Sequence, residues 1–180
     1  RDLVEKDYGR DLLSRAAEEF RAFRDDFPQA ILVLAEIRAN RVEVVLRASP
    51  DRPGVIQYPQ DFHVPPFGSA VGLVCLAFSD SLTALQLRES HPFEEAAAPL
   101  WPDRKTLDAF LEKAKKNGFL VTPFKKQESV RVAAPIFDSA GRFRGALGAA
   151  LPIDDTDIAK RTKLEKRVVA GAQALTGGPG

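Results

Sequence analysis

An alternating pattern of bulky and small side chains marks the stretch from Ser129 to Leu151 as a β-hairpin. Its two halves meet at a turn over Asp138 to Gly141, because Asp tolerates a tight turn and Gly readily adopts positive φ. Successive side chains on a strand point to opposite faces of a sheet, so each strand separates its residues into two sets. One set is bulkier and apolar: Val130, Val132, Ala134, Ile136, Leu147, Ala149 and Leu151.

The opposite face of this hairpin carries small residues and a single cation. Its members are Arg131, Ala133, Pro135, Ala146, Gly148 and Ala150. A sheet face that is reduced to Ala and Gly leaves room above it. We therefore expect this face to accept either a closely packed helix or a ligand.

Apolar residues at helical spacing predict five helices along the chain. Two of them have clear boundaries: one ends before Pro28, and another has Ser69 as its N-cap. Gly68 and Ser69 would let the backbone of the second helix approach a neighbour or an anionic ligand, although a buried helix packed on the sheet explains the same pattern. The expected helices cover residues 7–27, 69–78, 81–89, 103–117 and a final segment opened by Asp154, Asp155 and Asp157 and ending near Leu175.

Strand patterns outside the hairpin predict a first pair of strands and one short strand. The expected segments are 30–38, 41–48 and 119–121, with a turn at Ala39-Asn40 joining the first two. Residues 55–68 are rich in proline and aromatic side chains, which favours a loop with a short edge strand. The sequence predicts an irregular connection over residues 91–102. These patterns together predict one domain over residues 1–180, of the α/β (α+β) class, with an antiparallel sheet.

The composition narrows the classes of function. The chain of 180 residues is 44% hydrophobic and 28% charged with a formal net charge of +1, which is ordinary for a globular protein and unlike a polyanion-binding one. A single cysteine, Cys75, excludes an internal disulfide and a cysteine-based zinc site, and two histidines are too few for a histidine-rich metal site. We expect no metal and no cofactor. Without a membrane-spanning run or a secretory signal, we expect a cytoplasmic protein.

Several other features have two interpretations each. Cys75 in an apolar helix is more typical of a buried hydrophobe than of a nucleophile, so we expect no enzymatic activity. His91 either orients a ligand or lies in a surface turn, and Trp101 closes either a pocket or an interface. A basic run either contacts nucleic acid or forms a solvated helix face together with Glu165. That run consists of Lys160, Arg161, Lys163, Lys166 and Arg167.

Four motifs resemble the C-terminal effector-binding domain of IclR-type bacterial transcription regulators. The segment 67–78, F-G-S-A-V-G-L-V-C-L-A-F, is similar to the family's segment before and within its G-K-x-x-L-A helix, with Leu73 in place of the usual lysine. The segment 110–119, F-L-E-K-A-K-K-N-G-F, resembles the helix and glycine turn before the family's ligand loop. The hairpin sequence V-A-A-P-I-F-D-S-A-G at 132–141 is the most specific match. The ending V-A-G-A-Q-A-L-T-G-G at 169–178 resembles the terminal helix.

The resemblance implies a GAF/profilin-like fold, which is an antiparallel sheet flanked by helices. It also implies that a small metabolite binds above the sheet, that the protein forms a homodimer or tetramer, and that it represses or activates transcription. A winged helix-turn-helix domain would precede Arg1, and DNA would be bound only through that domain. Because the chain opens without methionine, we expect it to be the sensory part of a longer protein that lacks this DNA-binding domain here.

Residues that would bind the effector follow from the same resemblance. They are Phe67, Gly68, Ser69, Ala70, Thr122, Arg131, Ala133, Gly148 and Ala150. The family commonly has a small or sulfur-containing residue at the position of Arg131, and often has hydroxyls at Gly148 and Ala150. A guanidinium suits bidentate pairing with a carboxylate, so we expect an organic acid with an apolar or aromatic body. Alternatively, Arg131 pairs with Glu128 or points to solvent.

Three classes of function therefore remain at this point: a ligand-sensing regulatory domain, a purely structural oligomerisation module, and a GAF-type domain with another ligand or with cysteine redox chemistry. The last is disfavoured because Cys75 has no resolving partner. A cavity above Arg131, Gly148 and Ala150 would favour ligand sensing. A filled face would favour the structural module.

Overall fold

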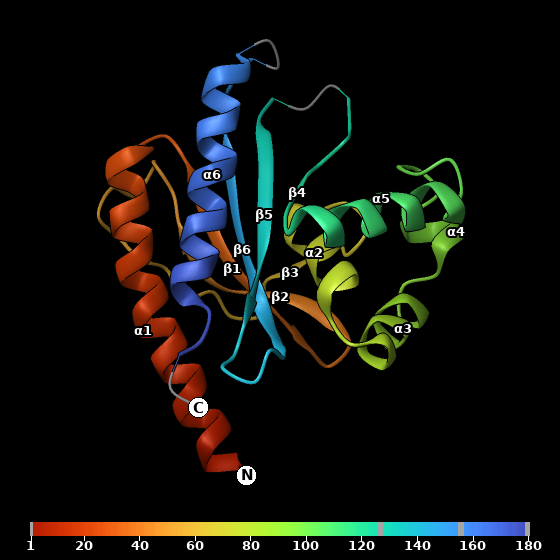
Figure 1. Cartoon of the computed structure of the whole chain (residues 1–180), viewed down its shortest axis with the longest axis horizontal. Helices are drawn as coiled ribbons and strands as arrows, with labels where there is room; N and C mark the ends of the chain where they lie inside the picture. Colours follow the sequence, from red (N-terminus) through yellow and green to blue (C-terminus); the bar gives the residue numbers. More distant parts are fainter. Residues whose placement is uncertain (1, 126–127, 155–156, 179–180) are drawn as a thin grey trace.

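A six-stranded sheet runs through the centre of the molecule in a computed structural model that describes residues 2–125, 128–154 and 157–178 (Figure 1). The strand order is β3-β2-β1-β6-β5-β4, and every neighbouring pair is antiparallel. The strands are β1 (Ile31–Arg38), β2 (Arg41–Ala48), β3 (His63–Val64), β4 (Leu120–Val121), β5 (Val130–Phe137) and β6 (Phe143–Leu151). The expected hairpin, β5 and β6, lies in the sheet next to β1.

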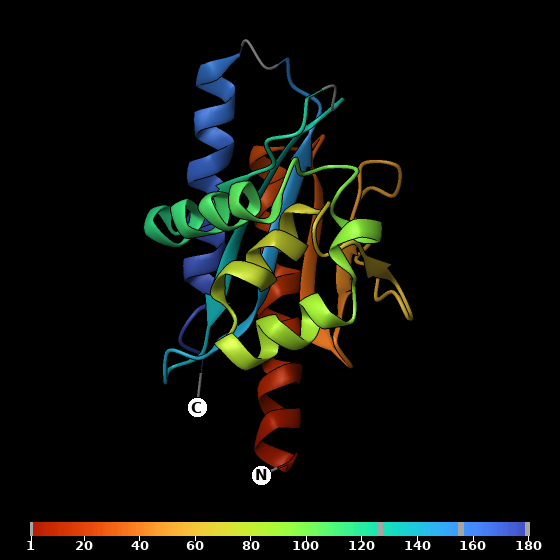
Figure 2. The ribbon, with the colours of Figure 1, turned by 90° about the vertical axis from the view of Figure 1, so that its right-hand side faces the viewer.

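Helices cover both faces of this sheet. In Figure 2 the α2–α5 segment lies in front of the sheet, and α1 and α6 lie behind it. The helices are α1 (Asp2–Asp26), α2 (Ala70–Phe78), α3 (Ser81–Glu89), α4 (Phe93–Ala96), α5 (Arg104–Asn117) and α6 (Ile158–Leu175). Helices on both sides of an antiparallel sheet confirm the predicted α+β class.

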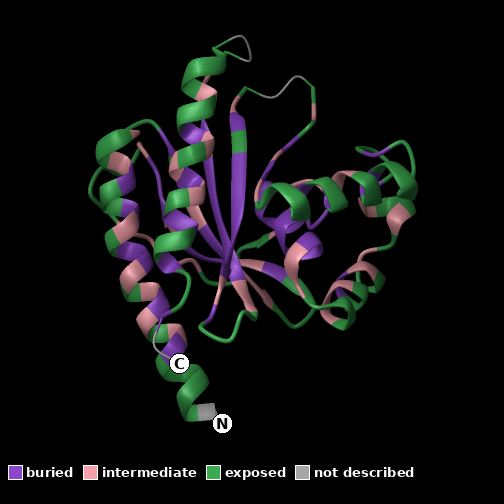
Figure 3. Cartoon of the chain, viewed as in Figure 1, coloured by how far each residue is buried: buried purple, intermediate pink, exposed green. Residues whose placement is uncertain are grey.

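Two hydrophobic clusters lie on the two sides of the sheet. The first contains Val132 and Leu147 and packs under α1 and α6, whereas the second contains Ala133 and Ala146 and packs under α2 and α5. Adjacent residues of one strand thus belong to different clusters, as alternation requires. Figure 3 shows that most residues of the central strands are buried. The predicted division of the hairpin into a bulky face and a small face is confirmed.

The turns and caps follow from local chemistry. Gly141 in the hairpin turn has φ of 76°, and Gly118 after α5 has φ of 79°, both in the left-handed region that glycine tolerates best. Ser69 caps α2 by accepting a hydrogen bond from the Gly72 N–H, and Asp103 caps α5 by accepting one from the Thr106 N–H. The sequence predicted both glycine positions and both caps.

Two helix starts and one connection differ from the sequence-based expectations. Helix α1 begins at Asp2 rather than at Asp7, and its first apolar residues, Leu3 and Val4, are exposed instead of packing on the sheet. Helix α6 begins at Ile158 after the N-cap Asp157, so Asp154 precedes the helix; Asp155 lies outside the described residues. The link 91–102 contains the short helix α4, which is too short to show a periodic pattern.

Candidate functional site

The floor of the small-residue face is closed by helix α2. A Cβ atom built on Gly148 would lie 2.6 Å from Cγ1 of Val71 and 3.1 Å from Cγ2 of Val33. Ala133, the register partner of Gly148 in β5, is fully buried in the same cluster. Of the two expected interpretations of this face, a close helix or a ligand, the close helix is observed at Gly148.

Beyond this floor, the same face continues into an open row of three side chains. Ile31 pairs with Ala150, and Ala150 pairs with Arg131, so the three lie side by side across β1, β6 and β5. Ile31 is 36% exposed, Ala150 is half-buried and Arg131 is exposed. Within the described residues the Arg131 guanidinium makes no hydrogen bond and no ion pair, so the expected alternative of a Glu128 partner is not observed.

The predicted residues at the start of α2 make contacts of their own. Phe67 is buried, and its carbonyl accepts a hydrogen bond of 2.9 Å from Nε1 of Trp101. The Leu100 side chain lies over Gly68, where a Cβ atom would come within 2.8 Å of it. Ser69 donates to the Pro65 carbonyl at 2.6 Å while capping the helix, and Ala70 is buried. These contacts hold the start of α2 in place, and the buried Trp101 packs against it.

Thr122, another predicted site residue, lines a cleft at the β4 edge. Its N–H donates to the Arg131 carbonyl at 3.1 Å, and its buried side chain lies beside a cleft of about 560 Å³ at the β4 edge. Aromatic and cationic side chains surround that cleft: Phe110, Phe119, Phe124, Lys113, Lys125 and Arg161. The aromatic residues flanking β4 were a visible signal in the sequence, but no pattern linked them to α5 and α6.

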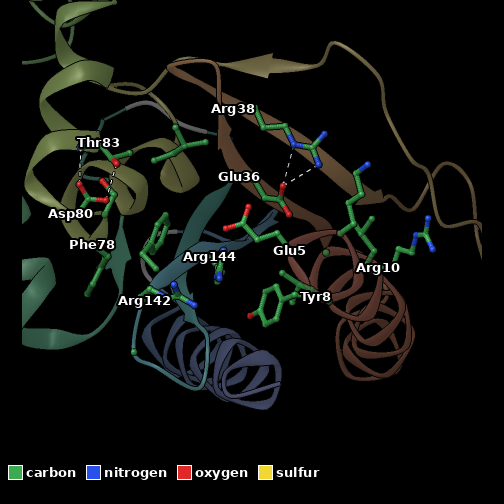
Figure 4. A pocket seen from close by; sticks show the side chains of 18 residues that line it. Glu5, Tyr8, Arg10, Glu36, Arg38, Phe78, Asp80, Thr83, Arg142 and Arg144 are labelled. Carbon is green, nitrogen blue, oxygen red and sulfur yellow. Dashed lines mark hydrogen bonds and ion pairs between the residues drawn. The ribbon is translucent and has the colours of Figure 1, made fainter. Parts of the chain in front are cut away.

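A larger cleft of about 1070 Å³ lies between α1, the β1–β2 hairpin, the start of α3 and the β5–β6 turn (Figure 4). None of the nine predicted site residues lines it. Arg142 directly precedes β6 and Arg144 lies within it, and the sequence signal was two arginines two residues apart beside the hairpin turn. The cations that line the larger cleft are Lys6, Arg10, Arg38, Arg142 and Arg144, and the anions are Glu5, Glu36 and Asp80.

A buried carboxylate organises one end of this larger cleft. Oδ2 of Asp138 accepts hydrogen bonds from Nε of Arg142 at 2.8 Å and Nε of Arg144 at 2.9 Å. Its Oδ1 accepts the N–H groups of Ala140 and Arg142, each at 2.9 Å. Burial disfavours the ionised carboxylate, but these hydrogen bonds, beginning with the Arg142 backbone N–H, outweigh it and lower the pKa of Asp138 to about 2.

Tyr8 and Glu36 contribute the other perturbed groups in the larger cleft. The Arg144 guanidinium carbon lies 4.8 Å from the centre of the Tyr8 ring. The Tyr8 hydroxyl is buried and has no hydrogen-bond partner within the described residues, and burial raises its pKa. Burial also raises the pKa of Glu36, against the opposing effect of Arg38, which pairs with it at 3.1 Å.

The described part of the chain offers little support for a reactive thiol, a free histidine, a metal site or a membrane span. Cys75 is fully buried, and burial raises its pKa, so its thiol stays protonated and inaccessible. His91 uses Nδ1 in a 2.8 Å hydrogen bond with the Leu87 carbonyl. No cluster of metal-ligating side chains occurs among the residues that the structure describes. No helix in those residues is both long and apolar enough to cross a membrane.

Comparison with known proteins adds information at the level of structure. No family model and no curated protein matches the sequence. The C-terminal domain of the E. coli transcriptional regulator KdgR has a TM-score of 0.74 at 15% identity, over 92% of this chain and 96% of that domain. A putative IclR transcriptional regulator from Silicibacter sp. TM1040 has a TM-score of 0.74 at 19% identity, over 91% of this chain and 65% of that one.

A third solved structure is described with a bound small molecule. It is an IclR homolog from Microbacterium hydrocarbonoxydans complexed with 4-hydroxybenzoate, with a TM-score of 0.70 at 19% identity, over 91% of this chain and 66% of that one. The chain thus spans nearly all of the KdgR C-terminal domain but about two thirds of the two longer regulators. The chain has the fold of the C-terminal domains of IclR-type transcriptional regulators.

Proposed function

We propose that this chain is the ligand-sensing domain of an IclR-type transcription regulator, and that it acts by binding a small organic acid rather than by catalysis. The observation that carries the proposal is the fold itself, which matches regulator domains over about 90% of the chain. One structural neighbour is described in complex with an aromatic acid, 4-hydroxybenzoate. The buried, protonated Cys75 offers no nucleophile that would favour an enzyme.

For the effector site we propose the open end of the α2 face of the sheet. The row of Ile31, Ala150 and Arg131 presents an apolar, a small and a cationic side chain side by side. The Arg131 guanidinium is exposed and unpaired within the described residues, so its donors are available to a carboxylate. The apolar or aromatic body of the acid would then lie over Ala150 and Ile31. Thr122, hydrogen-bonded to the Arg131 carbonyl, would border the site.

Other predicted site residues have supporting rather than ligand-contacting positions in this proposal. Gly148 and Ala133 form the closed floor beneath Val71. Phe67, Gly68, Ser69 and Ala70 fix the start of α2 through their contacts with Pro65, Leu100 and Trp101. Effector binding at the open row would act on the regulator by changing its oligomeric assembly, and with it the affinity for DNA.

A ligand screen tests the sensing function. Thermal-shift measurements with benzoate, 4-hydroxybenzoate, phenylacetate and succinate should identify an acid that stabilises the protein, since a ligand that binds the native state raises its stability by mass action. Calorimetry with that acid should show that Arg131→Ala loses roughly 2–3 kcal/mol of binding free energy, and that Arg131→Lys recovers only part of it. The control is Arg21→Ala, which removes an exposed arginine of α1 on the other side of the sheet. Equal binding by Arg131→Ala and the parent would refute the proposed site.

A structural oligomerisation module is the second candidate, and the filled floor at Gly148 favours it. Sedimentation at micromolar concentration separates the two candidates when it is combined with the ligand screen. A stable dimer or tetramer would support the structural module if none of the acids in the screen raises the melting temperature. A monomer would contradict the assembly that both candidates require.

Residues 1–180 on their own should leave duplex DNA unbound at physiological salt. Their formal net charge of +1 gives little of the phosphate neutralisation on which DNA affinity depends. DNA binding by the regulator would then belong to a winged helix-turn-helix domain. Sequence-dependent retention of DNA in a mobility-shift assay would overturn this assignment.

A further inference from the structure

The larger cleft lies apart from the proposed effector site. It shares no lining residue with the row of Ile31, Ala150 and Arg131. We propose that this cleft binds a small oxyanion, a carboxylate or a phosphate group, between the guanidinium groups of Arg142 and Arg144. The inference does not depend on the sensing function.

Asp138 orients the two guanidinium groups. Each uses its Nε to bond the same carboxylate oxygen, at 2.8 Å for Arg142 and 2.9 Å for Arg144. The described residues offer no hydrogen-bond partner for the terminal nitrogens of either side chain, although a guanidinium has five N–H donors. Because the Asp138 side chain is only 3% exposed, this anchor is shielded from solvent. Two guanidinium groups, each anchored through its Nε and each with terminal N–H groups to offer, therefore border the same cleft.

The charges near these arginines also favour an anion. Two guanidinium groups share one carboxylate, which leaves an excess positive charge at this end of the cleft. Of the three acids that line the cleft, Glu36 pairs with Arg38, Asp80 accepts the Thr83 N–H and hydroxyl, and Glu5 is an exposed residue of α1. Five cations line the same cleft, so positive charge still exceeds negative charge there. An oxyanion would neutralise the excess and accept two charge-assisted hydrogen bonds in the geometry that a guanidinium provides.

Tyr8 supplies an independent sign that the cleft is incomplete without a ligand. Its hydroxyl is buried and unpartnered within the described residues, whereas buried polar groups in proteins are nearly always hydrogen-bonded. Figure 4 shows this hydroxyl on the side of the ring that faces Arg142 and Arg144. The Tyr8 ring also supports the Arg144 guanidinium at 4.8 Å, which restricts its motion. An oxygen of a bound anion would be a suitable acceptor for this hydroxyl.

The test uses inorganic phosphate and succinate as separate probes on the full chain, at constant ionic strength set with chloride. Arginine Nε–Hε signals in nitrogen-15 NMR spectra report directly on the two guanidinium groups. We expect saturable shifts of the Arg142 and Arg144 signals with at least one probe, and the probe that binds identifies the oxyanion as a phosphate or a carboxylate. Arg142→Gln and Arg144→Gln should each weaken binding by about tenfold or more.

Arg10→Gln is the matched control, because Arg10 lines the same cleft and makes no contact with Asp138. It should change the dissociation constant little. Equal losses in all three variants would show diffuse charge attraction and overturn the site, as would unshifted Nε–Hε signals with both probes in the parent protein. If a Gln variant unfolds, the Arg142 and Arg144 Nε–Hε signals of the parent protein still show whether a probe binds at these residues. Arg131→Ala should leave these shifts intact, so failure of the effector proposal is distinguishable from failure here.

Discussion

Val71 of α2 packs directly on Gly148 of β6, so that a Cβ atom added to Gly148 would lie 2.6 Å from the Val71 Cγ1 atom. This contact sets how closely α2 approaches the sheet. It also divides the small-residue face into a closed floor and an open row that ends at Arg131. The small-residue face could accept a helix or a ligand, and at Gly148 it accepts a helix.

Substitution of Gly148 by Ala should therefore destabilise the fold itself. The added methyl group overpacks against Val71 and Val33, at a cost of roughly 1–3 kcal/mol in the free energy of unfolding. Urea denaturation measures this cost, and Val71→Ala in the same chain should restore part of it. Gly9→Ala is the control, since nothing lies within 4 Å of its added Cβ and alanine favours the helix by about 0.5–1 kcal/mol. A Gly148→Ala variant as stable as the parent would show that α2 is not seated on this glycine.

Cys75 should be inert to thiol reagents in the native protein. It is fully buried and its pKa is raised by burial, so neither access nor thiolate is available. A chromogenic disulfide reagent at neutral pH should label the protein only as fast as it unfolds, and completely in denaturant. Rapid labelling under native conditions would revive the cysteine redox class that this structure disfavours.

Within the basic run of α6, Arg167 should contribute to stability far more than an exposed lysine such as Lys163. The Arg167 guanidinium pairs with Glu19 and Asp26 of α1 and lies 4.7 Å from the centre of the Phe23 ring. Arg167→Gln should cost about 1–2 kcal/mol of stability, because a half-buried pair and a cation–π contact are lost together. Lys163→Gln, which changes an exposed residue of the same helix, should cost less than about 0.5 kcal/mol. Equal effects in urea unfolding would contradict the structural role.

Local chemistry made much of this fold predictable. The alternation around Ala133 and Gly148 predicted which side chains share a face, and Gly118 and Ser69 predicted where helices end and begin. These features depend on residues that are near one another in the sequence. The first turn of α1 was missed although Val4 lies at helical spacing from Tyr8.

Neither cleft followed from the sequence, and the reason is physical. The larger cleft brings together Tyr8, Glu36, Asp80 and Arg144, which belong to four elements far apart in the chain. The spacing of residues within one helix or strand cannot predict which other elements will lie beside it. The closure above Gly148 was equally hidden, because a small residue favours a close helix and a ligand alike until the packing partner, Val71, is known.

Asp138→Asn should destabilise the protein in a pH-dependent way. The carboxylate receives two guanidinium Nε–H and two backbone N–H hydrogen bonds while nearly fully buried, so replacing it by an amide leaves donors without an anionic acceptor. We expect a loss of roughly 2–4 kcal/mol near neutral pH. The pKa of Asp138 is lowered from 3.8 to about 2 in the folded protein, so its contribution is present above its unfolded pKa. It is lost as the pH falls through the folded value.

Urea unfolding of the parent and of Asp138→Asn at a series of pH values checks this. The stability difference should stay constant from neutral pH down to about pH 5 and shrink between about pH 4 and pH 2. Asp25→Asn, which alters an exposed carboxylate of α1, should show no such difference. A gap between parent and Asp138→Asn that stays constant down to pH 2 would mean that the ionised carboxylate is not what holds Arg142 and Arg144. In that case the two arginines owe their positions to packing on Tyr8 and the turn, and the anchor proposed for the oxyanion site is lost.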